Sequence, residues 1–124
     1  MNKLYVVGIG PGSKENMTFK AVDAIKEAET IVAYTKYLDY VEDFIAGKEI
    51  IKTGMTGEKE RCQLAIDEYN KGKTVAIIST GDSGLYGMAG LVYEIDSSIN
   101  IEVVPGVSAA FSSASVVGAP LMHD

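Results

Sequence analysis

A short stretch of small residues with one acid is the part of this chain best suited to hold a ligand. It reads Ser79-Thr80-Gly81-Asp82-Ser83-Gly84 and follows the apolar pair Ile77-Ile78. In a parallel α/β protein, ligands bind beyond the carboxyl ends of the strands, where such loops begin. Backbone amides, hydroxyl groups and one carboxylate can orient a small molecule but supply little acid–base chemistry. The stretch therefore predicts a binding loop over residues 79–84.

Two more loops of small residues follow apolar runs elsewhere in the chain. Gly10-Pro11-Gly12-Ser13 follows the run at 4–9, and Pro105-Gly106-Val107-Ser108 follows the run at 101–104. Such turns leave backbone N–H groups free to meet an anion or a carbonyl. Because the carboxyl ends of parallel strands lie at one edge of a sheet, we expect all three loops to open on the same edge.

The first of these loops does not fit a dinucleotide-binding fingerprint. The segment Gly8-Ile9-Gly10-Pro11-Gly12-Ser13 has Ser13 at the position of the third glycine, and Pro11 removes one backbone donor. The second apolar run ends in Tyr34-Thr35 rather than in an acid that could hold a ribose hydroxyl. The sequence therefore argues against nicotinamide and flavin cofactors.

Other common catalytic patterns are also incomplete. Gly72-Lys73-Thr74 lacks the glycine that a phosphate-binding loop carries five residues earlier, where Asp67 stands. Gly81-Asp82-Ser83-Gly84 is similar to the nucleophile loop of trypsin-like proteases, but the only histidine of the sequence is His123. One cysteine, Cys62, and one histidine cannot form a zinc site, so no metal site is predicted.

The composition is typical of one α/β domain with a real core. The chain has 124 residues, of which 47% are apolar, and a net charge of −6 without a basic cluster, which disfavours nucleic-acid binding. A single cysteine suits a reducing compartment. No apolar run reaches about 18 residues, and residues 1–3 lead into a strand pattern rather than a signal peptide. We therefore expect a cytoplasmic protein without a nucleic-acid or membrane partner.

Apolar runs predict five strands, and the segments between them predict helices. The runs are continuous rather than alternating, which is typical of parallel strands buried on both faces. Thr18 is the expected N-cap of the first helix, and Cys62 and Ala65 lie on the inner face of the second. The repeating pattern predicts an α/β three-layer sandwich with a mostly parallel five-stranded sheet and helices on both faces. The predicted strands are 4–9, 30–33, 49–51, 74–78 and 101–104, and the predicted helices are 18–28, 58–70 and 85–95.

Three features leave their interpretation open. Tyr37 fits a helical core stripe with Val41 and Phe44, yet Tyr34 and Tyr37 are also close enough to a strand end to line a pocket. Glycines at 87 and 90 inside a helix cost about 1 kcal/mol each relative to alanine, which suggests close packing or a nearby ligand. The segment 109–118 is rich in tiny residues and could form a helix that packs close to its neighbours.

Taken together, three segments resemble the signatures of the tetrapyrrole (corrin/porphyrin) methylase family. They are residues 7–12, 81–87 and 104–110, and their order and spacing match over essentially the whole chain. The family uses S-adenosylmethionine, held in a folded conformation between two α/β domains, and its members are homodimers. The resemblance covers the N-terminal domain, so residues 1–124 are expected to be that domain, with the C-terminal domain absent from this chain.

The resemblance also implies which residues form the site. Gly10, Gly12, Tyr34 and Tyr37 are candidates for contacts with the substrate. No catalytic residue can be assigned, since Lys52, Thr53, Tyr34 and His123 are candidates by position alone. The residues implied for cofactor binding are Pro11, Thr80, Gly81, Asp82, Leu85, Ser108 and Ala109.

Within the family, residues 83–92 and 119–124 look most like members that methylate corrin intermediates of cobalamin synthesis. Members acting on uroporphyrinogen III carry an aspartate after the second strand, where Tyr34-Thr35 stands here, and the proline common after the Asp of the middle motif is Ser83. The resemblance thus implies an S-adenosylmethionine-dependent C-methyltransferase acting on a cobalt-corrinoid (precorrin) substrate, with residues 1–124 inactive alone. Two alternatives stay open: a sibling methyltransferase with another corrin, a protein or rRNA substrate, and a non-catalytic dimerisation module.

Overall fold

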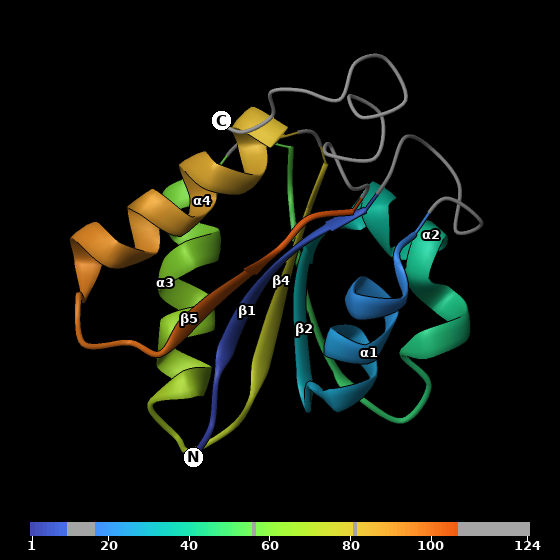
Figure 1. Cartoon of the computed structure of the whole chain (residues 1–124), viewed down its shortest axis with the longest axis horizontal. Helices are drawn as coiled ribbons and strands as arrows, with labels where there is room; N and C mark the ends of the chain where they lie inside the picture. Colours follow the sequence, from blue (N-terminus) through green and yellow to red (C-terminus); the bar gives the residue numbers. More distant parts are fainter. Residues whose placement is uncertain (10–16, 56, 81, 107–124) are drawn as a thin grey trace, which may run out of the picture.

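A five-stranded parallel sheet forms the middle layer of the molecule (Figure 1). The computed structural model describes residues 1–9, 17–55, 57–80 and 82–106, without the side chains of Asp82 and Ser83. The strand order is β3-β2-β4-β1-β5, and every neighbouring pair is parallel. The predicted sheet is therefore confirmed, and it is wholly rather than mostly parallel. The strands are β1 (Leu4–Ile9), β2 (Thr30–Tyr34), β3 (Glu49–Thr53), β4 (Val75–Thr80) and β5 (Ile101–Val104).

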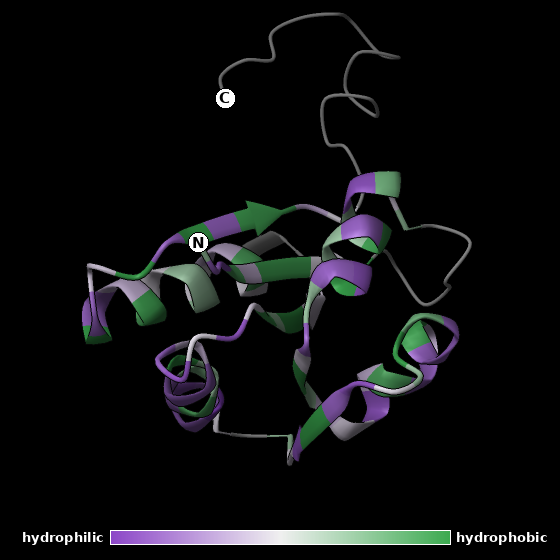
Figure 2. Ribbon diagram, turned by 90° about the horizontal axis from the view of Figure 1, so that it is seen from below, coloured by the Kyte–Doolittle hydropathy of each residue, from purple (hydrophilic) through white to green (hydrophobic). Residues whose placement is uncertain are grey.

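Helices cover both faces of the sheet, which confirms the predicted three layers. Figure 1 shows α1 (Phe19–Glu27) and α2 (Leu38–Val41) on one side and α3 (Glu58–Tyr69) and α4 (Asp82–Ile95) on the other. Successive residues of β1 point to opposite faces. The odd-numbered ones join the core beneath α1, and the even-numbered Leu4 and Val6 join the core beneath α3 and α4. Figure 2 shows that the helices carry both hydrophilic and hydrophobic residues, as expected of helices that pack one face against a sheet and expose the other.

The first helix begins where the sequence predicts. The side-chain oxygen of Thr18 accepts a hydrogen bond from the Ala21 N–H at 3.0 Å, so Thr18 is the N-cap of α1. Between β2 and β3 the chain forms short turns of helix rather than one continuous stripe. These are η2 (Thr35–Tyr37), α2 and η3 (Glu42–Phe44), of which Val41 alone is fully buried.

The predicted loop over residues 79–84 is wrong for most of its length. Ser79 and Thr80 continue β4, because Gly8 and Ile9 of β1 pair with them. Helix α4 begins at Asp82, three residues before the predicted start. One residue therefore separates the end of β4 from the start of α4, and the N-terminus of α4 lies at the carboxyl edge of the sheet.

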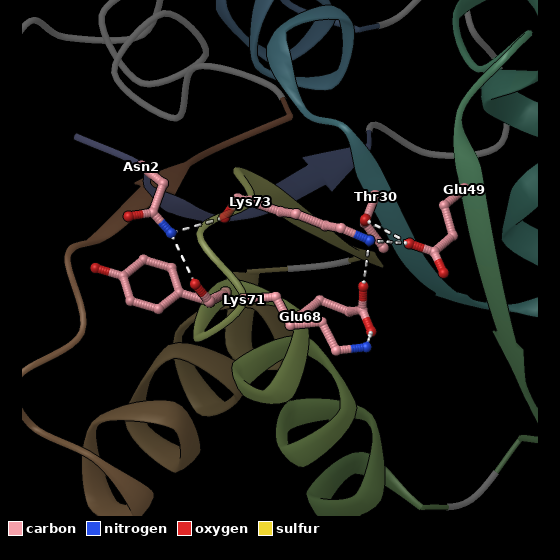
Figure 3. A network of polar contacts seen from close by, with 7 residues as sticks. Asn2, Thr30, Glu49, Glu68, Lys71 and Lys73 are labelled. Atoms are coloured by element: carbon pink, nitrogen blue, oxygen red, sulfur yellow. Dashed lines mark hydrogen bonds and ion pairs between the residues drawn. The ribbon is translucent and has the colours of Figure 1, made fainter.

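A network of charged side chains occupies the opposite, amino edge of the sheet (Figure 3). Glu68 accepts hydrogen bonds from the ammonium groups of Lys71 at 2.7 Å and Lys73 at 3.0 Å, and Lys73 also binds Glu49 at 2.8 Å. Hydrogen bonds from the two lysines lower the pKa of Glu68 to about 2. The Thr30 hydroxyl donates to Glu49 at 3.1 Å, which ties the network to the start of β2. These charges satisfy one another, so the network holds the fold together rather than offering a site.

Candidate functional site

The ends of β4, β1 and β5 meet at the carboxyl edge of the sheet. The loops predicted at 10–13 and 105–108 start from this edge, but residues 10–13 and 107–108 lie outside the described part of the chain. A Cβ atom added to Gly8 would lie 2.8 Å from the backbone nitrogen of Gly106, so β1 and the residues after β5 approach each other closely. Thr18 fixes this approach, because its N–H donates to Gly106 O at 3.1 Å and its hydroxyl donates to Pro105 O at 3.2 Å. Glycine at position 8 is therefore required by packing.

Several predicted binding residues lie outside the described part of the chain, and their roles stay predictions. They are Gly10, Pro11, Gly12, Gly81, Ser108 and Ala109. The same holds for the positional candidate His123 and for the segment 109–118.

A cavity of about 310 Å³ lies beside the end of β4. Its walls come from the ends of β2 and β4, from η2, from the residues after β3, and from α3 and α4. Small-molecule sites in proteins usually span about 300–1,000 Å³ and are mostly apolar with a few polar groups. The cavity lies within this size range, has a mixed lining of polar and apolar side chains, and could hold part of a ligand. Its lining residues are Tyr34, Tyr37, Met55, Glu58, Arg61, Ile78, Ser79, Thr80, Gly84 and Met88.

Two tyrosines form one wall of this cavity. The rings of Tyr34 and Tyr37 meet edge to face, with centroids 5.1 Å apart and an interplanar angle of 84°. The hydroxyl of Thr80 donates a hydrogen bond to the phenolic oxygen of Tyr37 at 3.1 Å. The sequence left open whether these tyrosines belong to the core or line a pocket. Both line the cavity, and Tyr37 also packs against the core beneath α1. The structure thus brings together Tyr34, Tyr37 and Thr80.

Two further residues implied for cofactor binding, Leu85 and Asp82, belong to α4. The Leu85 side chain is 1% exposed and packs in the core beneath α3 and α4, so a ligand could meet Leu85 through its backbone alone. Asp82 is the first residue of α4, where the helix dipole favours negative charge. No tight packing accounts for Gly87 or Gly90, because a Cβ at either position would have no neighbour within 4 Å among the described residues.

Arg61 is a cavity residue that sequence reasoning missed. Its side chain is almost fully buried, and its Nε donates to the Thr53 hydroxyl at 2.8 Å while one terminal nitrogen donates to Gly54 O at 3.0 Å. Helical spacing could have indicated it, since Arg61 precedes the buried Ala65 by one turn of α3. Met55 and Met88 were also missed as lining residues, whereas Ser79 and Thr80 belong to the binding stretch predicted over residues 79–84.

The remaining candidates offer no acid or base in the cavity. The Thr53 hydroxyl accepts a hydrogen bond from Arg61 and donates one to Ala33 O at 3.4 Å. Lys52 is exposed and does not line the cavity. Burial raises the pKa of Cys62 to about 11, so its thiol stays protonated at neutral pH. No group of His, Cys, Asp and Glu residues within the described ranges is arranged to hold a metal ion. None of the helices described there has the length and apolar character of a membrane span.

The parallel sheet and the cavity beside the end of β4 define an α/β domain with a candidate small-molecule site at its carboxyl edge. The family model "Tetrapyrrole (Corrin/Porphyrin) Methylases" matches residues 3–124. The chain therefore belongs to the tetrapyrrole methylase family, as its three signature segments indicated.

Relatives and solved structures place the chain within this family. It is 49% identical over 125 residues to the "Probable cobalt-factor III C(17)-methyltransferase" of Salmonella typhimurium strain LT2, covering 98% of the chain and 52% of the relative. The fold matches the crystal structure of the methyltransferase CobJ with a TM-score of 0.75 and 29% identity, over 100% of this chain and 54% of that one.

A further structure, uroporphyrin-III C-methyl transferase from Thermus thermophilus complexed with S-adenyl homocysteine, matches with a TM-score of 0.65 and 28% identity, over 91% and 48% of the two chains. The chain thus spans about half the length of these proteins.

Proposed function

We propose that this chain is the N-terminal, cofactor-binding domain of an S-adenosylmethionine-dependent C-methyltransferase of cobalamin biosynthesis. The enzyme methylates C17 of a cobalt-precorrin-3-type ring and contracts the macrocycle. The observation that carries the proposal is the 49% identity to the Salmonella relative across 98% of the chain. A uroporphyrinogen substrate is disfavoured, because Tyr34-Thr35 stands where members that use it carry an aspartate.

The carboxyl edge of the sheet is suited to the kind of chemistry that the cofactor supplies, namely a methyl group already activated on a sulfonium. The domain needs to bind and orient two ligands and to exclude water, and effective positioning alone can contribute several kcal/mol to such a reaction. Thr80, Asp82 and the backbone of Leu85 would hold the cofactor together with Pro11, Gly81, Ser108 and Ala109. Tyr34 and Tyr37 would form an aromatic wall toward the substrate, with Gly10 and Gly12 near it.

The opposite wall of the cleft belongs to a second domain, in this proposal, and the working enzyme is a cytoplasmic homodimer. The chain covers 52% of the Salmonella relative, which leaves room for a domain of similar size. A half-site binds a ligand more weakly than a closed cleft, because it buries less of the ligand surface. Residues 1–124 alone should therefore bind the cofactor weakly and turn over little or no substrate.

Calorimetric titration of the full-length enzyme with S-adenosylhomocysteine tests the cofactor site. We expect Asp82→Ala to weaken binding at least about tenfold, equivalent to about 1.4 kcal/mol. Loss of the charge at the start of α4 should lower the free energy of unfolding by only about 0.3–1 kcal/mol, so the variant should still fold. Glu94→Ala is the matched control, since Glu94 is exposed in the last turn of the same helix. Equal affinity of wild type and Asp82→Ala would contradict the site, and a wild-type enzyme that binds no S-adenosylhomocysteine would favour a non-catalytic module.

A further inference from the structure

We propose that Arg61 binds a carboxylate group of a ligand that enters the cavity beside β4. The class of ligand rests on the proposed function, because the methionyl end of the cofactor and the acid side arms of a corrinoid substrate both present aliphatic carboxylates. The cavity chemistry is the same for either source, and the test below separates them.

The burial of Arg61 is the first observation. The side chain is 3% exposed, and a buried guanidinium is costly unless an anion compensates its charge. Its described partners, the Thr53 hydroxyl and the Gly54 carbonyl, are both neutral. Among the described residues Arg61 forms no ion pair with a carboxylate. This contrasts with the amino edge, where the lysine charges meet Glu68 and Glu49.

The hydrogen bonds of Arg61 also leave it ready to receive an anion. A guanidinium has five N–H donors in a planar fork, and the described contacts use two of them. These two bonds anchor the group to the end of β3 and so fix the plane of the fork. A preorganised fork matches a carboxylate through paired, charge-assisted hydrogen bonds.

The surroundings of Arg61 strengthen such an interaction. Apart from Glu58, the side chains that bound the cavity with Arg61 are aromatic, aliphatic, thioether and hydroxyl groups, including Tyr34, Met88 and Thr80. Apolar walls lower the local dielectric constant and make a charge-assisted hydrogen bond stronger than in water. Glu58 is exposed, and the ion pairs between described residues include none from Glu58 to Arg61.

Binding measurements on the full-length enzyme with two pairs of probes test the proposal. The first pair is S-adenosylhomocysteine and its decarboxylated analogue, and the second is cobyrinic acid and its heptamethyl ester. We expect the wild type to prefer the acid in at least one pair. Arg61→Gln should weaken binding of that acid at least about tenfold and abolish the preference. Lys59→Gln is the control, since it removes one positive charge from an exposed position on α3 outside the cavity lining.

The outcomes show whether the carboxylate belongs to the cofactor or to the substrate. They also distinguish failure of the role of Arg61 from failure of the proposed function. Loss of preference in the first pair assigns Arg61 to the cofactor, and loss in the second assigns it to a substrate side arm. Arg61→Lys, which keeps the charge but not the fork, should lose a smaller part of the preference, and it replaces Arg61→Gln if that variant does not fold. A wild type that binds the probes without preferring either acid, or a folded variant that keeps the preference, overturns the role of Arg61. A wild type that binds neither cofactor nor corrinoid contradicts the proposed function instead.

Discussion

The hydroxyl of Thr80 donates a hydrogen bond across 3.1 Å to the phenolic oxygen of Tyr37, 43 residues earlier in the chain. The contact joins the last residue of β4 to the last residue of η2, on the wall of the cavity. Tyr37 in turn supports the ring of Tyr34 edge to face. The hydrogen bond and the ring contact together connect a residue implied for cofactor binding with two residues implied for substrate contacts.

Tyr37→Phe tests the structural value of this contact. The substitution keeps the ring and removes the acceptor of the Thr80 hydroxyl, so we expect the free energy of unfolding to fall by about 1 kcal/mol. Urea denaturation measures it, with Tyr40→Phe as the control because Tyr40 packs against the same core through its ring. An equal effect of both substitutions would show that the hydrogen bond contributes nothing measurable.

Gly8→Ala should be destabilising because of one close approach. Its new methyl group would lie 2.8 Å from the Gly106 nitrogen, a backbone atom that can move only with the chain after β5. We expect a loss of about 1–3 kcal/mol, the range for overpacking, and weaker binding of S-adenosylhomocysteine in the full-length enzyme.

Gly90→Ala provides the matched comparison for this substitution. A methyl group at this exposed position of α4 meets nothing within 4 Å among the described residues, so helix propensity should dominate. Urea denaturation of the 124-residue chain should then show a gain of about 0.5–1 kcal/mol. Similar losses at positions 8 and 90 would contradict the packing described for β1.

Glu68 should make the stability of the chain depend on pH in the acid range. Hydrogen bonds from Lys71 and Lys73 lower its pKa to about 2 in the folded state, so the unfolded state binds the proton more readily. The contribution of Glu68 is present above its unfolded pKa, near 4.3, and is lost as the pH falls toward 2.

Glu68→Gln should accordingly lower the free energy of unfolding by about 1–2 kcal/mol at pH 7, and the difference from wild type should shrink as the pH falls. Urea unfolding at a series of pH values measures this, with Glu94→Gln as the exposed control. A difference that is constant with pH would refute the assigned ionisation.

Cys62 should be unreactive in the folded protein. The side chain is buried, with its sulfur 3.3 Å from the sulfur of Met88, and burial raises its pKa to about 11. At pH 8 we expect a disulfide reagent to modify the native protein at least about a hundredfold more slowly than the protein unfolded in urea. Comparable rates would mean that α3 and α4 open far more often than their packing implies.

The sequence predicts the sheet well because continuous apolar runs are a strong signal for parallel strands buried on both faces. The end of β4 was harder to predict, since Ser79 and Thr80 have the polarity of a loop and are held in the strand by pairing with Gly8 and Ile9. Such pairing is a tertiary effect that local composition does not report. The start of α4 at Asp82 was missed for the related reason that small polar residues are as typical of loops as of first helical turns.

The residues of the candidate site also differ in whether local sequence or tertiary packing brings them to the cavity. The aromatic wall could be predicted because Tyr34 and Tyr37 lie close to the end of a strand, and the structure adds the hydrogen bond between Tyr37 and Thr80. Arg61 lies on a helix that starts several residues after β3, and only the packing of α3 against the sheet brings it to the cavity. Motif reasoning finds residues at strand ends, whereas a side chain delivered by a neighbouring helix carries no comparable signature.

The most direct test of the central claim is mass spectrometry of the product formed by the full-length enzyme from cobalt-factor III and S-adenosylmethionine labelled with a deuterated methyl group. The proposed function predicts one labelled methyl group on the corrinoid ring, with its position at C17 shown by fragmentation, and less or no product from the metal-free substrate. Asp82→Ala should abolish the labelled product while Glu94→Ala forms it as the wild type does. An enzyme that binds S-adenosylhomocysteine yet leaves both ring substrates without label would contradict the assignment.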